Sequence, residues 1–465
     1  MRHRVVLRGV AYDLYTGHPP TKDPPTMHTL KDFDNLPFTG RHRAITLCAG
    51  GGSFIDAYVL IIIGVALENL MKDFSLDTFW VGVITASTFV GLAIGTTLFG
   101  YIADRIGRKK LFIFNIFALA TCSILSALVT TPTELALARF FMGLLIGADY
   151  PIATSMVAEF SPIKSRAWAM GTIAAIWFVG GICASLAGYF CYDLENSWRW
   201  MLASAVIPCV LVLWGRIRVP ESPRWLLMHG KAAKARAVFK KFGLDIPLSE
   251  LEKDVHRDVE SVNILGIFQG KNLRNLVFVA TIWLCQAVPM FAIYMYGPQI
   301  MSGFDAVTPK EALLANTVIS IAFFLGCIPA MWCTTEFGRR VVCISSYLLM
   351  TLSLGAMVIW STNPVVLFIG LVTYALVSGG PGTLQWLYPN ELFSTDIRAT
   401  AVGCAMSITR IATILTTFYM YPILLKYGSE TVLMGAFLIT MVGLVTSVLF
   451  APETKSLSLT GADHV

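Results

Sequence analysis

Three ionisable side chains lie in segments of this sequence that are otherwise apolar. Asp56 and Asp149 are single carboxylates among hydrophobic residues, and Arg410 is a single guanidinium in a third such segment. Removing a charge from water is costly, and burial favours the uncharged form of a carboxyl group. The two aspartates are therefore candidate proton carriers. Arg410 is a candidate binding group for a carboxylate or phosphate, which a guanidinium can hold with two hydrogen bonds.

The segments around these residues are suited to crossing a membrane. The chain has 465 residues, 55% of them hydrophobic and 14% charged, with a mean hydropathy of +0.67. A soluble globular chain carries about 25% charged residues. About 20 apolar residues cross a bilayer as a helix, and backbone groups in lipid must bond to one another, so the sequence predicts an all-α membrane protein. Uncharged runs occur at 111–133, 167–192, 275–304, 312–335 and 341–390.

We predict twelve transmembrane helices. They cover residues 44–71, 79–103, 111–131, 133–158, 167–191, 199–217, 275–300, 312–334, 341–361, 364–388, 399–424 and 431–451. Basic clusters follow the second, fourth, eighth and tenth spans, and residues 218–273 carry ten Lys and Arg. Because basic loops stay on the cytoplasmic side, both termini and this central segment are expected in the cytoplasm.

An internal repeat divides the chain into two halves. Glu159 and Arg166 recur as Glu391 and Arg398, and "PES" at 220–222 recurs as "PET" at 452–454, each 232 residues later. "IGRK" at 106–109 recurs as "FGRR" at 337–340. This repeat predicts two six-helix halves in the same orientation, which is typical of transporters with a central site between the halves.

The repeat also sets the expected domain boundaries. They are a disordered cytoplasmic tail at 1–43, a first bundle at 44–217, a cytoplasmic loop at 218–273, a second bundle at 274–452 and a short cytoplasmic tail at 453–465. Met27 follows a proline-rich stretch at 18–26 and is a second candidate for the first residue.

Several motifs resemble those of the major facilitator superfamily, in its sugar-porter-like branch. They are "GYIADRIGRKK" at 100–110, "PESPRWLL" at 220–227, "GPGTLQW" at 380–386 and "PETK" at 452–455. "FIDAY" at 54–58 and "GADYP" at 147–151 are similar to motifs of phosphate:proton symporters and of uncharacterised bacterial inner-membrane metabolite transporters. Those phosphate carriers have another acidic residue in the seventh helix. Residues 275–304 contain none, which argues against phosphate as the substrate.

The resemblance implies a cytoplasmic gate made of charged helix ends. In sugar porters, such residues form ion-pair networks that hold the cytoplasmic side closed while the protein faces outward. Ordinary surface ion pairs, worth about 0–1 kcal/mol each, are the alternative. The residues at the matching positions are Asp104, Arg105, Arg108, Glu159, Arg166, Glu221, Arg224, Glu336, Arg339, Glu391, Arg398 and Glu453.

The same resemblance suggests residues that contact the substrate. Gln286 resembles the sugar-contacting glutamine of the seventh helix, and Trp386 resembles the tryptophan of the tenth helix that stacks on sugar rings. Arg410 favours an anionic or polyhydroxylated metabolite. Alternatively, Arg410 neutralises Asp56 or Asp149, or the aspartates form a structural pair with Arg410 or Arg139. Further candidates are Tyr294, Tyr296, Gln385 and Tyr388, with an interfacial aromatic belt as the alternative for Tyr388.

These features predict a secondary transporter that works by alternating access. We expect proton-coupled symport of an organic anion, sugar acid, sugar or polyol, by a monomer in the bacterial inner membrane. A facilitative uniporter and a non-transporting receptor are the alternatives. An enzyme is not expected, since all seven His lie outside the predicted spans. No phosphate-binding G-x-x-x-x-G-K-[ST] loop occurs, the ten Cys are scattered, and no cofactor, metal or nucleic acid is predicted.

Overall fold

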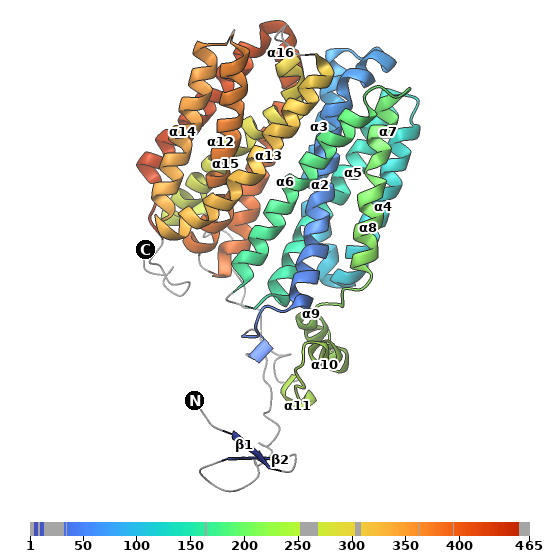
Figure 1. Cartoon of the computed structure of the whole chain (residues 1–465), viewed down its shortest axis with the longest axis vertical. Coiled ribbons are helices and arrows are strands. Elements are labelled where there is room, and N and C mark those ends of the chain that lie inside the picture. Colours follow the sequence, from blue (N-terminus) through green and yellow to red (C-terminus); the bar gives the residue numbers. More distant parts are fainter. Residues whose placement is uncertain are drawn as a thin grey trace.

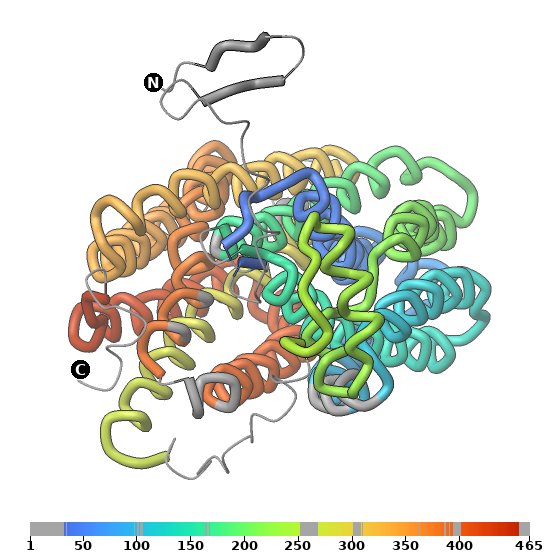
Figure 2. Tube along the Cα trace, turned by 90° about the horizontal axis from the view of Figure 1, so that it is seen from below, coloured from blue at the N-terminus to red at the C-terminus, as the bar shows by residue number. Residues whose placement is uncertain are grey.

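The protein was analysed as a computed structural model of the whole chain. The structure describes residues 4–7, 10–13, 32–33, 35–162, 165–251, 268–302, 308–361, 363–393 and 395–454. Two helical bundles stand side by side, one from each half of the sequence (Figures 1 and 2). Both ends of the described part of the chain and the short helices of the central segment lie at the same end of the molecule, which we call the inner end (Figure 1).

The first bundle contains six membrane crossings. Its sixth crossing is built from two short consecutive helices. The helices are α2 (Gly40–Phe74), α3 (Thr78–Ile106), α4 (Arg108–Leu128), α5 (Pro132–Phe160), α6 (Arg166–Cys191), α7 (Ser197–Ser204) and α8 (Val206–Arg216).

The second bundle repeats this arrangement. Its last helix has 56 residues and is broken at Gly428, where φ is +80°. At 1.5 Å per residue it is about 84 Å long, more than twice the hydrocarbon thickness, so it supplies two crossings. The twelve predicted spans and the all-α fold are thereby confirmed. The helices are α12 (Gly270–Ser302), α13 (Pro309–Glu336), α14 (Arg339–Ile359), α15 (Pro364–Leu392) and α16 (Thr395–Phe450).

Local sequence signals fix where several helices begin. α5 begins at Pro132, directly after Thr131. The Thr131 hydroxyl accepts a hydrogen bond from the backbone N–H of Glu134, and the Glu134 carboxylate accepts one from the N–H of Thr131. This reciprocal pair caps the N–H groups that a first helical turn leaves unbonded. At α2, the N–H of Thr39 donates to Nδ1 of His42. Because α2 begins at Gly40, His42 lies inside this helix, and its assignment outside the spans was wrong.

Short elements lie outside the bundles. β1 (Arg4–Leu7) and β2 (Val10–Asp13) form an antiparallel hairpin within the tail that was expected to be disordered. In the central segment, α9 (Pro223–Met228), α10 (Ala232–Lys241) and α11 (Leu248–Leu251) pack at the inner end of the first bundle.

The two bundles are joined at their outer ends. The Tyr296 hydroxyl of α12 donates to the carbonyl of Thr417 on α16 at 2.7 Å, and the Thr85 hydroxyl of α3 lies 3.2 Å from both the Tyr296 hydroxyl and that carbonyl, which links the halves. These contacts between halves hold the outer side closed. Others join Gln299 to the carbonyl of Gly64 (3.0 Å), Asn316 to Ser185 (3.2 Å), and Lys310 to Asp193.

Candidate functional site

Asp56 lies in the middle of α2 with its carboxylate enclosed by protein. Its side chain is 1% exposed, and neither oxygen accepts a hydrogen bond from any residue that the structure describes. Its charged neighbours are Asp149, Arg216 and Arg410. A buried, unpaired carboxylate is costly to keep ionised, so its position is suited to taking up and releasing a proton.

Asp149 has a different environment, although it lies near Asp56. Its Oδ1 and Oδ2 accept hydrogen bonds from the two terminal nitrogens of Arg216 at 2.5 and 2.8 Å. Asn115 of α4 also donates to Oδ1, at 3.2 Å. Arg216 also donates hydrogen bonds to the backbone carbonyls of Phe112 (2.9 Å) and Cys48 (3.3 Å). Its guanidinium lies over the Phe112 ring. This buried pair therefore connects α2, α4, α5 and α8.

The sequence alone did not identify Arg216. It lies at the cytoplasmic end of the sixth span, next to other basic residues, where a charge is normally explained by membrane orientation. Arg410 and Arg139 were the partners considered for Asp149, and the structure shows Arg216 instead. One signal in the sequence could have identified Arg216. A single residue separates it from Arg218, so the two side chains can lie on opposite faces of the helix.

Arg410 brings a positive charge from the second half to the same region. It is partly exposed, and its electrostatic neighbours are Asp56 on α2 and Tyr150 on α5. The structure records no hydrogen bond or ion pair of its guanidinium with the described residues. The Asp56 carboxylate and the Arg410 guanidinium, which come from different halves, are thus close enough to interact electrostatically but do not pair directly.

Arg139 is also buried in the first bundle. It is fully enclosed and donates one hydrogen bond, at 2.9 Å, to the carbonyl of Val59 on α2. Its Nε and its second terminal nitrogen make no hydrogen bond among the described residues. The expected pairing of an aspartate with Arg139 is therefore not seen among the described contacts.

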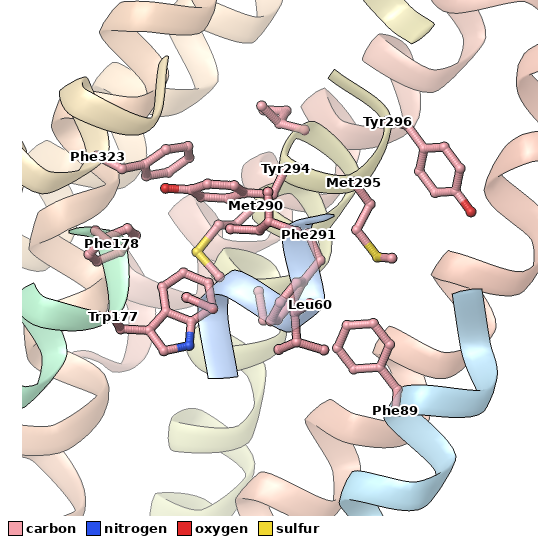
Figure 3. Packing of buried hydrophobic residues seen from close by; sticks show 14 of the residues in the cluster. Leu60, Phe89, Trp177, Phe178, Met290, Phe291, Tyr294, Met295, Tyr296 and Phe323 are labelled. Carbon is pink, nitrogen blue, oxygen red and sulfur yellow. The ribbon is translucent and has the colours of Figure 1, made fainter. Parts of the chain in front are cut away.

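An aromatic cluster closes the outer side of the charged region. Leu60 lies one helical turn after Asp56, and the rings of Phe89, Trp177 and Phe291 pack around it (Figure 3). The ring centroids of Phe89 and Phe291 are 5.1 Å apart, and those of Trp177 and Phe291 are 6.2 Å apart. These rings come from both halves, so the cluster separates the charges from the outer contacts.

The other predicted substrate residues are distributed over several places. Gln286 is buried and donates to Ser378 of α15 at 3.3 Å, within the second bundle. Gln385 is partly exposed on α15. Tyr294 stacks on Phe323, with centroids 4.8 Å apart, in the aromatic cluster of Figure 3.

Two of the predicted substrate tyrosines have their hydroxyls engaged elsewhere. Tyr296 belongs to the outer contact between the halves, as described above. Tyr388 donates to the carbonyl of Pro452 at 3.1 Å, at the inner end of the second bundle. Neither hydroxyl lies beside Asp56 in this arrangement. The side chains of Asp104, Arg105, Trp386 and Arg398 lie outside the described part of the structure.

The predicted gate residues form two matching networks at the inner end. In the first bundle, Arg108 pairs with Glu159, which also accepts a hydrogen bond from Ser222. Glu221 accepts the backbone N–H of Lys109 at the start of α4, at 3.1 Å. A carboxylate is favourable there because a helix N-terminus carries unbonded N–H groups and partial positive charge.

The second bundle contains the same network. Arg339 binds Glu391 with two hydrogen bonds of 2.8 and 3.3 Å, and Thr454 donates to Glu391. Glu453 accepts the N–H groups of Arg339 and Arg340 at 3.0 and 3.1 Å, at the start of α14. The described contacts of each network lie within one bundle, so in this arrangement they tie the inner helix ends of each half together.

Of the other gate residues, Arg166 donates to the carbonyl of Ser161 at 3.4 Å. Arg224 lies on α9, and Glu336 ends α13.

Neutralising the two repeated glutamates is expected to slow transport. In Glu159→Gln and Glu391→Gln the arginine keeps its position but loses its charged partner, and hydrogen bonds to charged groups are worth about 1.5–3 kcal/mol. We expect each variant to fold and to transport about five- to tenfold more slowly in proteoliposomes. Glu195→Gln, on the exposed outer loop, is the matched control. Unchanged rates in both variants would rule out a gating role.

The fold and this site define a membrane transporter with two six-helix halves, not an enzyme. The family model described as "Sugar (and other) transporter" matches residues 45–465, and the chain belongs to this family. It is a multi-pass protein of the bacterial cell membrane.

Individual relatives agree with this assignment. The chain is 47% identical to YaaU of Escherichia coli (strain K12), a metabolite transport protein by name, over 93% of this chain and 97% of YaaU. It is 31% identical to the inner membrane metabolite transport protein YgcS of the same organism, over 93% and 96%. Its fold is similar to that of the proton:xylose symporter XylE bound to 6-bromo-6-deoxy-D-glucose. The TM-score is 0.75 and the sequence identity 21%, over 91% of this chain and 98% of XylE.

Proposed function

We propose that this transporter is a proton-coupled symporter of a small anionic metabolite, such as an organic acid or a sugar acid. Asp56 carries the proton, and Arg410 binds the anionic group of the substrate. The observation that carries this proposal is the buried Asp56 carboxylate, which has no hydrogen-bond partner among the described residues and interacts electrostatically with Arg410 of the other half.

The charges around Asp56 support an anionic substrate. Asp56 has one aspartate and two arginines as charged neighbours, so these four groups carry no net charge when all are ionised. Protonation of Asp56 leaves them with one excess positive charge and removes the negative charge that opposes Arg410. A carboxylate can then bind the guanidinium with two hydrogen bonds. Binding of the proton and of the anion thus favour each other, which is the requirement for symport.

The position of the pair between the halves supports coupling to the conformational change. Asp56 belongs to the first bundle and Arg410 to the second, while the outer ends are held closed by Tyr296 and Gln299. When the anion is released, Arg410 has no bound ligand. The free energy of bringing Arg410 closer to Asp56 then differs from its value in the anion-bound state. A ligand shifts such an equilibrium only by its differential affinity for the two states.

Reconstitution of the purified protein tests this proposal. A thermal-shift screen of organic acids, sugar acids, sugars and polyols first identifies a compound that binds. Uptake of that compound into proteoliposomes is then measured with and without an inward proton gradient, with a pH-sensitive dye inside. We expect accumulation with the gradient and acidification of the interior when substrate is added. Uptake that ignores the gradient would identify a uniporter, and binding without uptake would identify a receptor.

The role of Arg410 has its own measurement in the same system. In Arg410→Gln the region loses the cation for the anionic group, so we expect the affinity for an anionic substrate to fall at least 100-fold. Arg410→Lys keeps the charge but not the two-point geometry and is expected to lose less. A neutral sugar or polyol as the true substrate would instead bind both variants about equally.

A further inference from the structure

We propose that Asp149 and Arg216 form a lasting ion pair that positions α2 and places a fixed negative charge beside Asp56. Asp149 itself does not carry the transported proton in this proposal. The assignment rests on the proton symport proposed above, because it divides the two aspartates between distinct tasks. Arg216 is then a positioning residue of the transport mechanism, acting through Asp149.

The hydrogen bonds of Arg216 support a fixed pair. Its guanidinium donates to both oxygens of Asp149 and to the carbonyls of Phe112 and Cys48, and both members of the pair are at most 1% exposed. Moving Arg216 would break contacts to three other helices at once. The long side chain reaches from the inner end of α8 to the middle of α5, so the pair braces the first bundle.

The oxygens of Asp149 are held by three hydrogen bonds. Oδ1 accepts from Arg216 and Asn115, and Oδ2 accepts from Arg216. Protonation would leave the Arg216 charge buried without its counter-ion, which is costly. Asp56 presents the opposite case, since neither of its oxygens accepts a hydrogen bond from the described residues.

Gly52 fixes the distance between the pair and α2. A Cβ atom at this position would lie 1.8 Å from Oδ2 of Asp149 and 2.1 Å from a terminal nitrogen of Arg216. The helix backbone therefore packs directly on the ion pair, and any larger residue would have to displace it. Asp56 follows one helical turn later on the same face of α2, so this contact sets the position of Asp56 relative to the fixed charge.

The charges that face Asp56 determine how its proton affinity responds to substitutions. They are Asp149 on α5, Arg216 on α8 and Arg410 on α16, and the Tyr150 hydroxyl of α5 also lies near this group. Loss of the negative charge of Asp149 makes proton binding at Asp56 less favourable. At an effective dielectric of about 20, one unit charge several ångströms away corresponds to about one to two pH units.

An infrared pH titration of the purified full-length protein tests the assignment without any ligand. The carbonyl stretch of a protonated buried carboxyl group is followed near neutral pH. We expect this band in the native protein and in Asp149→Asn, and its loss in Asp56→Asn. In Asp149→Asn the midpoint is expected about one to two pH units lower. A band that disappears in Asp149→Asn and persists in Asp56→Asn would overturn the proposal.

A double variant covers the case in which Asp149→Asn fails to fold. Asp149→Asn with Arg216→Gln removes both charges, so no unpaired charge stays buried. We expect the band to persist in this variant as well. Its loss there, with the band present in the native protein, would show that Asp149 holds the proton.

The positioning contact is tested by two alanine substitutions on the same helix. Gly52→Ala pushes the ion pair away from α2, and the midpoint of the band is expected to change by at least about half a pH unit. Gly50→Ala is the matched control, because its Cβ meets the flexible end of Ile176. Equal midpoints in the two variants would refute the positioning role.

Failure of this inference can be distinguished from failure of the proposed function. Uptake that ignores the proton gradient refutes symport, while the infrared titration still decides which aspartate holds a proton. Conversely, coupled uptake together with a band that belongs to Asp149 refutes only the division of roles.

Discussion

Asp56→Asn is expected to abolish accumulation of substrate by a proton gradient while leaving exchange of substrate across the membrane intact. The amide has nearly the same shape as a protonated carboxyl group but cannot release a proton. The variant therefore resembles the permanently protonated state, which binds the anion and still changes conformation. Because accumulation depends on proton release at the inner side, the expected loss is complete, whereas a general folding defect would remove both activities.

Three assays check this result in the same proteoliposomes. They are uptake driven by a proton gradient, exchange with substrate trapped inside, and proton entry reported by an internal dye. Asp245→Asn is the matched control. Asp245 is an exposed aspartate of the central segment, where the hydrogen bond from Arg236 lowers the pKa of the carboxyl below its ordinary value. Gradient-driven accumulation that persists in Asp56→Asn would show that this residue is not the proton carrier.

Gly64→Ala is expected to prevent closure of the outer side. A Cβ atom at Gly64 would lie 2.2 Å from the backbone carbonyl oxygen of Met295 on α12. The backbone of α2 fixes the position of this Cβ, so a side-chain movement cannot relieve the clash. The outer contact between the halves, including the hydrogen bond from Gln299 to Gly64, must then open. Shifting a two-state equilibrium from 1:99 to 99:1 takes about 5.5 kcal/mol. We expect the overlap at Gly64 to shift the equilibrium between closed and open outer sides far enough for transport to fall at least 100-fold.

The outer contact between Asp193 and Lys310 provides the measurement. Cysteines at these two positions, in a background without reactive native cysteines, are expected to form a disulfide with oxidant in the native sequence and not with Gly64→Ala. Gly403→Ala is the control in another transmembrane helix, since its Cβ meets no atom within 4 Å. Cross-linking and transport that are unaffected by Gly64→Ala would contradict this account of outer closure.

The helices and the two halves could be predicted closely from the sequence. The uncharged runs given above marked six of the twelve crossings, because a charge in hydrocarbon is costly, and the spacing of 231–232 residues marked the duplication. The repeat is visible in the contacts: the Arg108–Glu159 pair of the first bundle corresponds to the Arg339–Glu391 pair of the second. Helix ends differed by up to five residues, as at α12, which begins at Gly270 and not at residue 275.

The partners of the buried charges could not be predicted in the same way. Sequence reasoning treated Asp56 and Asp149 alike, as candidate proton carriers. In the structure Asp149 pairs with Arg216, whereas Asp56 has no direct partner among the described residues and only an electrostatic interaction with Arg410. Tyr296 and Tyr388 looked alike as polar aromatic residues of spans, yet one joins the two halves and the other binds the backbone at Pro452.

By itself, the sequence determined that this chain crosses a membrane twelve times in two repeated halves, and which of its residues are too polar for lipid. Hydropathy and internal repeats are properties of the linear sequence, so they can be recognised without knowing the tertiary contacts. Only the tertiary structure decided which charge each carboxylate faces. That depends on the rotation and packing of helices that are far apart in the sequence. At Gly52, for example, the absence of a Cβ atom lets α2 pack directly on the Asp149–Arg216 pair.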